Sequence, residues 1–308
     1  MNHIRLLHLF NWKLTDITNE LKLVKEQNFN AILINPLQEL KEDSPNTLPW
    51  WMSYQPRSFN IGNPYGSKEE LALLCEKAEH YDIKIIADAI CNHMGGTVNG
   101  SEYNPTPHES VDKNLSQNPN FWKTGGILKD ESCWNDRQKV ISASIQGLPG
   151  LNLANNELQE QHIFPFLEEY IALGVAGLRF DAAKNIALPE EDNTCQFWPE
   201  VVRRFSNKIL LAEVLNVDQS LTDQYINQGL NVITDLYNLT GDNLMKFAES
   251  HDSYLSPEVG YTSHLSDDQI NHDYQALTKK ENKTLYYARP FSNSWKRDLV
   301  KHSNNQKC

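Results

Sequence analysis

Gly177-Leu178-Arg179-Phe180-Asp181-Ala182-Ala183-Lys184 continues an apolar run that begins at residue 175, and it places a cation and a carboxylate two residues apart. Residues i and i+2 of a β-strand point to the same side, so we expect Arg179 and Asp181 to face one site where this strand ends. A neighbouring cation favours the ionised form of a carboxylate, which is the form that a carboxylate nucleophile needs. For this segment taken alone, a buried structural ion pair is the alternative interpretation.

On both sides of this segment, short apolar runs alternate with amphipathic stretches. We expect strands at 4–10, 29–34, 83–88, 175–180, 209–214, 231–236, a short one ending near 251–252, and one at 284–288. We expect helices after residue 15 and at 68–80, 155–173, 198–205, 221–228, 242–248, 267–279 and within 294–302. Eight strand–helix units predict an α/β fold, the (β/α)8 TIM barrel, with a doubly wound open sheet as the alternative. No G-x-G-x-x-G follows the first strand, which argues against a dinucleotide-binding open sheet.

Two of these helices begin with residues that favour capping. Thr15 is expected to cap the first helix, because its hydroxyl can accept a bond from an unpaired backbone N–H. Ser67 and Glu70 have the spacing of a capping box and predict that the second helix begins at residue 68.

The segment from 94 to 149 differs from the rest of the chain. It is rich in Gly, Asn, Ser, Pro and Thr and shows weak periodicity. A stretch of this length is rarely a plain loop. We therefore predict an inserted subdomain B at 94–149 and a catalytic barrel made of residues 1–93 and 150–308.

Composition limits the classes of partner. The chain has 308 residues and a formal net charge of -12, which argues against a nucleic-acid or anionic-membrane partner. The acidic balance fits a neutral substrate or solubility, and a monomer is expected. No run is apolar and long enough to span a bilayer. The N-terminus lacks a signal-peptide cleavage site, so we expect a protein that stays inside the cell, is exported by another route, or has a leader outside this chain.

The five cysteines give no sign of a metal-binding framework. Their number is odd and no two of them form a C-x-x-C pair. A zinc ribbon or a dense disulfide framework is therefore not expected, while one or two disulfides remain open.

Several predicted strands end in carboxylates. Asp88, Asp181 and Glu213 lie at the ends of three predicted strands, and the pair His251-Asp252 lies at the end of another. Active sites of parallel barrels lie at the C-terminal ends of the strands. Like charges repel one another, so four such ends around one mouth indicate a functional site better than a structural one.

Paired carboxylates without a metal-like cluster, a Ser-His pair or a Cys-His pair favour glycosidic chemistry. Asp181, kept ionised beside Arg179, suits the nucleophile. Glu213 follows apolar residues, and partial desolvation would make it a proton donor. Asp252 could stabilise the positive charge of an oxocarbenium-like transition state, and His93 and His251 could hydrogen-bond sugar hydroxyls.

Three aromatic residues cluster after the second predicted strand. Trp50, Trp51 and Tyr54 would offer ring faces on which pyranose rings could stack. A local hydrophobic cap is the alternative interpretation.

Four segments resemble, in order, the four sequence blocks of the α-amylase family of retaining glycoside hydrolases: 88–93, 177–185, 212–214 and 251–252. Three more segments are similar to the animal-type branch of that family, which includes bacterial members: 9–12, 50–56 and 92–94. The resemblance covers about residues 5–290. The family usually continues into an all-β C-terminal domain, and the 308 − 290 = 18 remaining residues are too few for one, so we expect a barrel with an insertion only.

The resemblance implies Asp181 as nucleophile, Glu213 as general acid/base and Asp252 as transition-state stabiliser. It implies hydrolysis of α-1,4 bonds in starch, glycogen or maltooligosaccharides. A transglycosylase of the same fold and an inactive glucan-binding protein remain alternatives. Asp88 would support the site from below. The residues expected to bind substrate are Trp50, Trp51, Tyr54, Gln55, His93, Arg179, Lys184 and His251.

The resemblance also implies ions. Asn92 and the carbonyl of Asn185 match two calcium ligands of the family, but Gly150 stands where an aspartate ligand is usual. Calcium prefers several hard oxygen ligands, carboxylates among them, so the glycine counts against it. For chloride, Arg179 is kept. Ser250 replaces the usual Asn, and Lys296 matches the third position only loosely.

Overall fold

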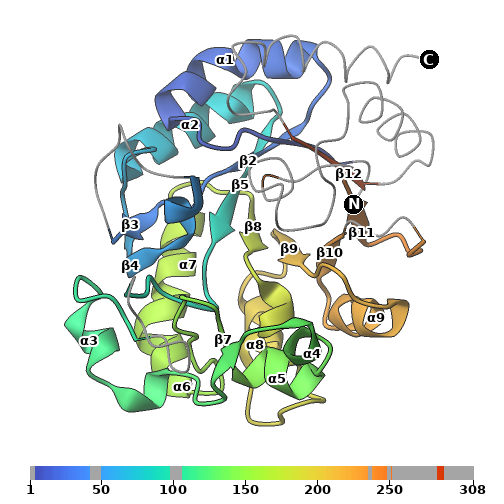
Figure 1. Cartoon of the computed structure of the whole chain (residues 1–308). Helices are drawn as coiled ribbons and strands as arrows, with labels where there is room; N and C mark the ends of the chain where they lie inside the picture. The colour runs from blue at the N-terminus through green and yellow to red at the C-terminus, as the bar shows by residue number, and fades with distance from the viewer. Residues whose placement is uncertain are drawn as a thin grey trace.

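A computed structural model of the chain describes residues 4–41, 50–97, 106–234, 238–247, 251 and 283–287. Eight parallel strands close a barrel in the order β1-β12-β11-β10-β9-β8-β5-β2 (Figure 1). Their bounds are Arg5–His8 for β1, Ala31–Ile34 for β2, Lys84–Ala89 for β5, Gly177–Phe180 for β8, Ile209–Glu213 for β9, Asn231–Thr234 for β10, Leu244–Lys246 for β11 and Lys283–Tyr287 for β12. The predicted (β/α)8 barrel is confirmed, and the open sheet is excluded.

The barrel interior is apolar below and polar above. One buried cluster joins apolar side chains of six strands and fills the lower interior, and among its members are Leu6, Leu33, Ile86, Leu211, Ile233 and Met245. Because side chains alternate along a strand, the residue two positions further on faces the same interior one layer higher. Three such steps end in polar groups: Leu6 to His8, Ile86 to Asp88, and Leu211 to Glu213. The polar layer is thus built at the C-terminal ends of the strands.

The first two helices pack beside each other outside the barrel. α1 is Leu14–Glu26 and buries Leu14, Ile17, Leu21 and Val24 on one face. Thr15 does not cap it, because the helix begins one residue earlier and the Leu14 N–H donates to the Tyr65 carbonyl at 2.8 Å.

The capping box predicted for the second helix is confirmed. α2 is Lys68–His80. The Ser67 N–H donates to Glu70 Oε2 at 2.8 Å, and the Glu70 N–H donates to Ser67 Oγ at 3.2 Å.

The long helix predicted at 155–173 is three consecutive pieces. α6 is Asn156–Leu158, a π-helical turn follows at Gln159–Ile163 (η3), and α7 is Phe164–Ala172. Pro165 has no N–H to continue the α-helical ladder, which accounts for a break in the helix at this point. Two further helices, α8 at Phe197–Arg204 and α9 at Gln219–Asn227, follow β8 and β9.

One predicted helix is wrong. Residues 242–248 were expected to be helical, but Leu244–Lys246 form strand β11 between β10 and β12. The seventh strand therefore ends at Lys246 and not near 251–252. Its pairs, Val232 with Leu244 and Met245 with Lys283, show that pairing with neighbours overrides the local pattern. The helices predicted at 267–279 and within 294–302 lie outside the described residues.

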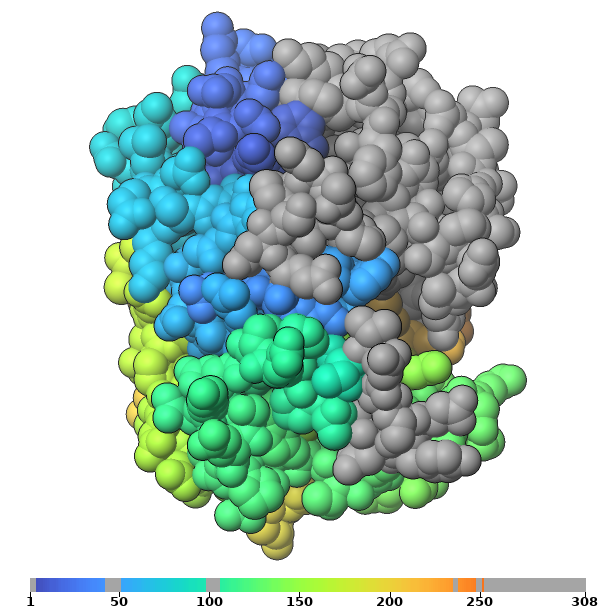
Figure 2. Space-filling view, turned by 60° about the vertical axis from the view of Figure 1, so that its left-hand side comes forward, coloured from blue at the N-terminus to red at the C-terminus, as the bar shows by residue number. Residues whose placement is uncertain are grey.

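Two irregular regions flank the C-terminal ends of the strands. After β2, strands β3 (Gln38–Leu40) and β4 (Pro56–Ile61) form an antiparallel pair with the 3-10 turn η1 (Trp50–Tyr54) between them. After β5 come the short elements α3 (Lys113–Ser116), η2 (Pro119–Phe121), β6 (Ile127–Leu128), α4 (Glu131–Trp134), α5 (Arg137–Ser142) and β7 (Ser144–Ile145). In the space-filling view, green residues of this second region form a lobe at the surface (Figure 2). The domain boundaries at 94 and 149 stay a prediction.

Two sequence expectations concern cysteines and membranes. Cys75, Cys91, Cys133 and Cys195 carry free thiols. Cys308 lies outside the described residues. Within the described part of the chain, no helix has the length and apolarity that crossing a membrane would require.

Candidate active site

Arg179 is the centre of the polar layer. Its side chain is 3% exposed, and Nη1 donates to both carboxylate oxygens of Asp88 at 2.7 Å and to Asp181 Oδ1 at 2.9 Å. Nη2 donates to Glu213 Oε1. Register explains the arrangement, since Asp88 of β5 pairs directly with Arg179 of β8, and β9 lies on the other side of β8. Three carboxylates from three neighbouring strand ends thus share one guanidinium.

The charges of this cluster are coupled. Burial alone would lower the pKa of Arg179, but the attraction of Asp88, Glu213, Tyr54 and Asp181 holds that pKa well above its usual value. Burial raises the pKa of Asp88 to about 7, against the opposing pull of Arg179. The Tyr54 hydroxyl also donates to Asp88 Oδ2 at 3.0 Å. The guanidinium therefore stays charged, and Asp88 is enclosed between two donors.

A strained turn brings Asp181 and Glu213 together. The Asp181 N–H donates to the Ala89 carbonyl at 3.1 Å, which extends the β5–β8 ladder by one residue. Ala182 then adopts a left-handed conformation, with φ of 47°, and its N–H donates to Glu213 Oε2 at 2.9 Å. An L-residue in this region costs about 1–2 kcal/mol, a strain that is common at functional sites.

Glu213 has two hydrogen-bond donors that the sequence did not predict. The sequence predicts a carboxyl group that is partly desolvated, because apolar residues precede it. In the structure its side chain is 15% exposed, and its oxygens accept bonds from Arg179 and from the Ala182 N–H. Both donors favour the charged carboxylate.

His93 lies beside Asp181 as a neutral imidazole. Burial lowers its pKa to about 4. Its Nε2 lies 3.0 Å from the Tyr54 carbonyl, which can only accept, so Nε2 carries the proton. Nδ1 then accepts from Asn92 Nδ2 at 3.3 Å. The same Nε2 is 4.0 Å from Asp181 Oδ2.

His251 is part of an aromatic stack in the same layer. Its ring is nearly parallel to Tyr54, with centroids 5.1 Å apart and an interplanar angle of 9°, and its other stacking partner is Phe10 at 4.6 Å. Burial lowers the pKa of His251 to about 3. Near neutral pH both imidazoles are therefore uncharged. The predicted stabiliser Asp252 lies outside the described residues.

The other predicted substrate residues lie around this layer. Lys184 Nζ donates to the Leu215 carbonyl at 3.0 Å and lies 4.9 Å from the centre of the Trp134 ring. Trp51 is 42% exposed. Gln55 Oε1 is buried without a hydrogen-bond partner among the described residues. The side chain of Trp50 is not among those that the structure describes.

The sequence did not single out Trp134, an exposed aromatic residue of the inserted segment. It is 37% exposed, and its ring contacts Lys184, which lies in the loop that follows β8. Contact between a cation and an aromatic ring is favourable, and an exposed tryptophan suits a sugar ring. Its position at 134, in a segment of weak periodicity, gave no local signal.

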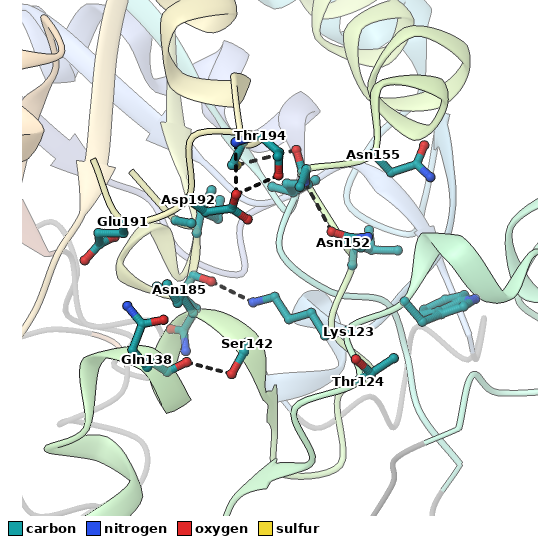
Figure 3. Close-up of a pocket in the computed structure, with 18 of the residues that line it drawn as sticks. Lys123, Thr124, Gln138, Ser142, Asn152, Asn155, Asn185, Glu191, Asp192 and Thr194 are labelled. Carbon is teal, nitrogen blue, oxygen red and sulfur yellow. Dashed lines mark hydrogen bonds between the residues drawn. The ribbon is translucent and has the colours of Figure 1, made fainter. Parts of the chain in front are cut away.

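The residues expected to bind calcium contact a lysine. Lys123 Nζ donates to Asn92 Oδ1 at 2.8 Å. It also donates to the Asn185 carbonyl at 2.6 Å (Figure 3). Lys123 is half-buried, and burial lowers the pKa of its ammonium group to about 7. Among the described residues, no three His, Cys, Asp or Glu side chains gather in a way that could hold a metal ion. The residues present at this place do not fit calcium.

The residues that the family resemblance assigns to chloride are only partly described. Ser250 and Lys296 lie outside the described residues, and both terminal nitrogens of Arg179 donate to carboxylates.

A cavity of about 1000 Å³ adjoins Lys123. It lies between the inserted segment and the loop 185–195, and Asn152, Asn155, Asn185 and Asp192 are among its lining residues (Figure 3). Neither Arg179 nor any of its three carboxylates lines it. The cavity is therefore separate from the candidate active site.

Comparison with known proteins bears on this geometry. Residues 12–287 match the family model described as alpha amylase, catalytic domain. An α-amylase of Clostridium acetobutylicum is 29% identical over 94% of this chain and 40% of its own length. An α-amylase of Aeromonas hydrophila is 32% identical over 59% of this chain and 40% of its own length. The chain thus spans about two fifths of the length of these curated relatives.

Solved structures show the same fold. The α-amylase I of Eisenia fetida has a TM-score of 0.73 at 19% identity, covering 94% of this chain and 67% of the other. A cyclomaltodextrin glucanotransferase, CldA, has a TM-score of 0.74 at 13% identity, covering 100% of this chain and 80% of the other. At these identities the likeness concerns the fold alone. The match of the family model to residues 12–287, nine tenths of the sequence, shows that this chain belongs to the α-amylase family.

Proposed function

We propose that the chain is a retaining α-glucan hydrolase that cleaves α-1,4-glucosidic bonds in starch, glycogen or maltooligosaccharides. The observation that carries the proposal is the shared contact of Asp181 and Glu213 with the Arg179 guanidinium at the ends of β8 and β9. Membership of the α-amylase family supports the coarser assignment, a hydrolase or a glucanotransferase.

The closeness of the two carboxylates favours retention over inversion. Retaining glycosidases keep their two carboxyl groups about 5–5.5 Å apart, whereas inverting enzymes need about 6.5–9.5 Å to admit a water molecule. Two carboxylates bound to the terminal nitrogens of one guanidinium lie close together. A separation in the retaining range is therefore our prediction for this pair.

In the proposed reaction, Asp181 attacks the anomeric carbon while Glu213 gives its proton to the leaving oxygen. Glu213 then takes a proton from water, which cleaves the covalent glycosyl-enzyme. Because Arg179 and the Ala182 N–H favour its charged form, we expect Glu213 to take up the proton only after its side chain turns away from Arg179. Asp252 is proposed to stabilise the positive charge of the transition state.

We propose that the reacting sugar lies over the histidine–tyrosine layer. The neutral imidazole of His251 can hydrogen-bond a hydroxyl group, and Tyr54 offers a ring edge or face. His93 can do so once its Nε2–H turns from the Tyr54 carbonyl to the sugar. Lys184 and Trp134 would contact the sugar on the leaving-group side. The further residues proposed to contact the glucan are Trp50, Trp51, Gln55 and Arg179.

The test is release of reducing sugar from starch by Asp181→Asn and Glu213→Gln. Each should lose roughly 10³-fold or more of the activity, since each removes a group that takes part in bond making or breaking. Asp16→Asn, which changes an exposed carboxylate of α1, is the matched control and should keep full activity. Starch hydrolysis retained by Asp181→Asn would refute the assignment.

Products separate the alternatives. Longer chains formed from maltooligosaccharides would identify a transglycosylase, which shares the covalent intermediate but uses a sugar as acceptor. Glucan binding without new reducing ends in the unchanged protein would identify an inactive binding protein.

A further inference from the structure

Lys123 joins three parts of the chain through one side chain. It lies two residues beyond η2 in the inserted segment, and its N–H donates to the Gly150 carbonyl at 2.8 Å. Its Nζ reaches Asn92 Oδ1, just after β5, and the carbonyl of Asn185 in the turn η4 (Ala183–Asn185) just after β8. The ammonium group therefore fastens the inserted segment to the loops of two neighbouring barrel strands.

The two oxygens that Lys123 binds are those that the family resemblance assigns to calcium. Calcium requires six to eight oxygen ligands at about 2.3–2.6 Å. A lysine nitrogen 2.8 Å from one of these oxygens and 2.6 Å from the other leaves no room for a second cation between them. Two cations at this spacing would also repel each other strongly.

The position of the Lys123 side chain requires a glycine at position 150. A Cβ atom added at Gly150 would lie 2.7 Å from Lys123 Cδ and 3.3 Å from its Cγ. Any side chain at 150, an aspartate included, would have to displace the lysine stem. The glycine that removes a calcium ligand is thus the residue that admits the lysine.

We propose that the side chain of Lys123 replaces calcium as the group that holds the inserted segment against the barrel, so that the fold of this protein does not depend on calcium. Both protonation states of a lysine offer at least two N–H donors, enough for the two oxygens. The inference stands apart from the proposed hydrolase activity, because its tests measure metal binding and unfolding.

The first test uses the unchanged protein. Thermal unfolding in excess calcium chloride and in excess EDTA should give the same Tm to within about 1 °C, because a ligand that binds the folded state would raise it. Equilibrium dialysis against radioactive calcium should find no bound ion. A Tm several degrees higher in calcium than in EDTA, or one calcium bound per chain, would overturn the proposal.

The second test uses variants. Lys123→Met should lower the Tm by roughly 5 °C or more, because it leaves Asn92 Oδ1 and the Asn185 carbonyl without their hydrogen-bond donor. Added calcium should not restore the Tm. Lys113→Met, an exposed lysine of α3, is the matched control and should unfold like the unchanged protein. An unchanged Tm for Lys123→Met would refute the fastening role.

A double variant tests the replacement itself. Lys123→Ala combined with Gly150→Asp removes the stem and supplies a carboxylate beside the same two oxygens. We expect its Tm to rise with calcium and fall with EDTA, while neither reagent affects the unchanged protein. No response of the double variant to calcium would show that these oxygens cannot form a cation site and would contradict the replacement.

Discussion

Replacing Arg179 by methionine should expose how much the polar layer depends on one cation. Asp88 is fully buried and receives its charge-assisted bonds from Arg179, so Arg179→Met leaves it with the Tyr54 hydroxyl and no charge partner. Breaking one side of a buried ion pair costs about 3–5 kcal/mol of the free energy of unfolding. Arg203→Met removes an ion pair whose arginine is 64% exposed, and it should leave the free energy of unfolding nearly unchanged because solvent screens such a pair.

The pH dependence gives this prediction a sharper form. Without Arg179, burial acts unopposed and raises the pKa of Asp88 further, so between the unfolded and folded pKa values the folded state holds the extra proton. Stability of the variant must then fall as pH rises through that window. Urea unfolding followed by tryptophan fluorescence should show a larger cost of Arg179→Met at pH 8 than at pH 5. The double variant with Asp88→Asn should recover part of the loss. A cost below about 1 kcal/mol, or one equal at both pH values, would refute the reasoning.

Three further predictions concern other parts of the fold. Ser67→Ala should lower the free energy of unfolding by about 1 kcal/mol in urea because it removes half of the capping box, whereas Thr15→Ala should be nearly neutral; equal costs would contradict the assignment of the cap. His93→Gln should reduce the loss of stability on acidification. The pKa of His93 is about 4 in the folded state and 6.5 when the residue is free, so between these values the unfolded chain binds the extra proton. The free energy of unfolding of the unchanged protein should therefore fall by about 2 kcal/mol more than that of the variant between pH 8 and pH 5. His80→Gln, at an exposed site, should follow the unchanged protein, and a parallel curve for His93→Gln would count against a buried neutral ring. Tyr225→Phe should cost about 1–3 kcal/mol in the same assay, because its hydroxyl donates toward the carbonyls of Ala183 and Ile186 and accepts from Arg137; full stability would show that these bonds are dispensable.

The sequence was most informative where a local pattern and the fold agree. Apolar runs that end in Asp88, Asp181 and Glu213 predict both strands and a polar rim, because the two-residue alternation of a strand carries a side chain from the apolar layer to the layer above it. The capping box at Ser67 is equally local, since both of its bonds lie within four residues.

The features that the sequence missed depend on contacts between distant residues. β11 has three residues in a segment with a helical pattern, and its partner β12 begins 283 − 246 = 37 residues later. Lys123 lies 31 residues from Asn92 and 62 residues from Asn185, so no local sequence pattern predicts these two hydrogen bonds. The environment of Glu213 likewise follows from the guanidinium of a neighbouring strand, which local hydrophobicity does not reveal.

The closure of the barrel has a consequence for how the chain is made. β1 forms a parallel ladder with β12, in which Arg5 pairs with Thr284 and His8 pairs with Tyr287. These pairs cannot form until β12 has been synthesised. During synthesis from the N-terminus, nearly all of the described chain must leave the ribosome before that seam can form. Until then β1 presents an unpaired edge on which another chain could add a strand. The nascent chain is therefore most exposed to aggregation in the interval before residue 287 emerges, and a chaperone that covered this edge would act there.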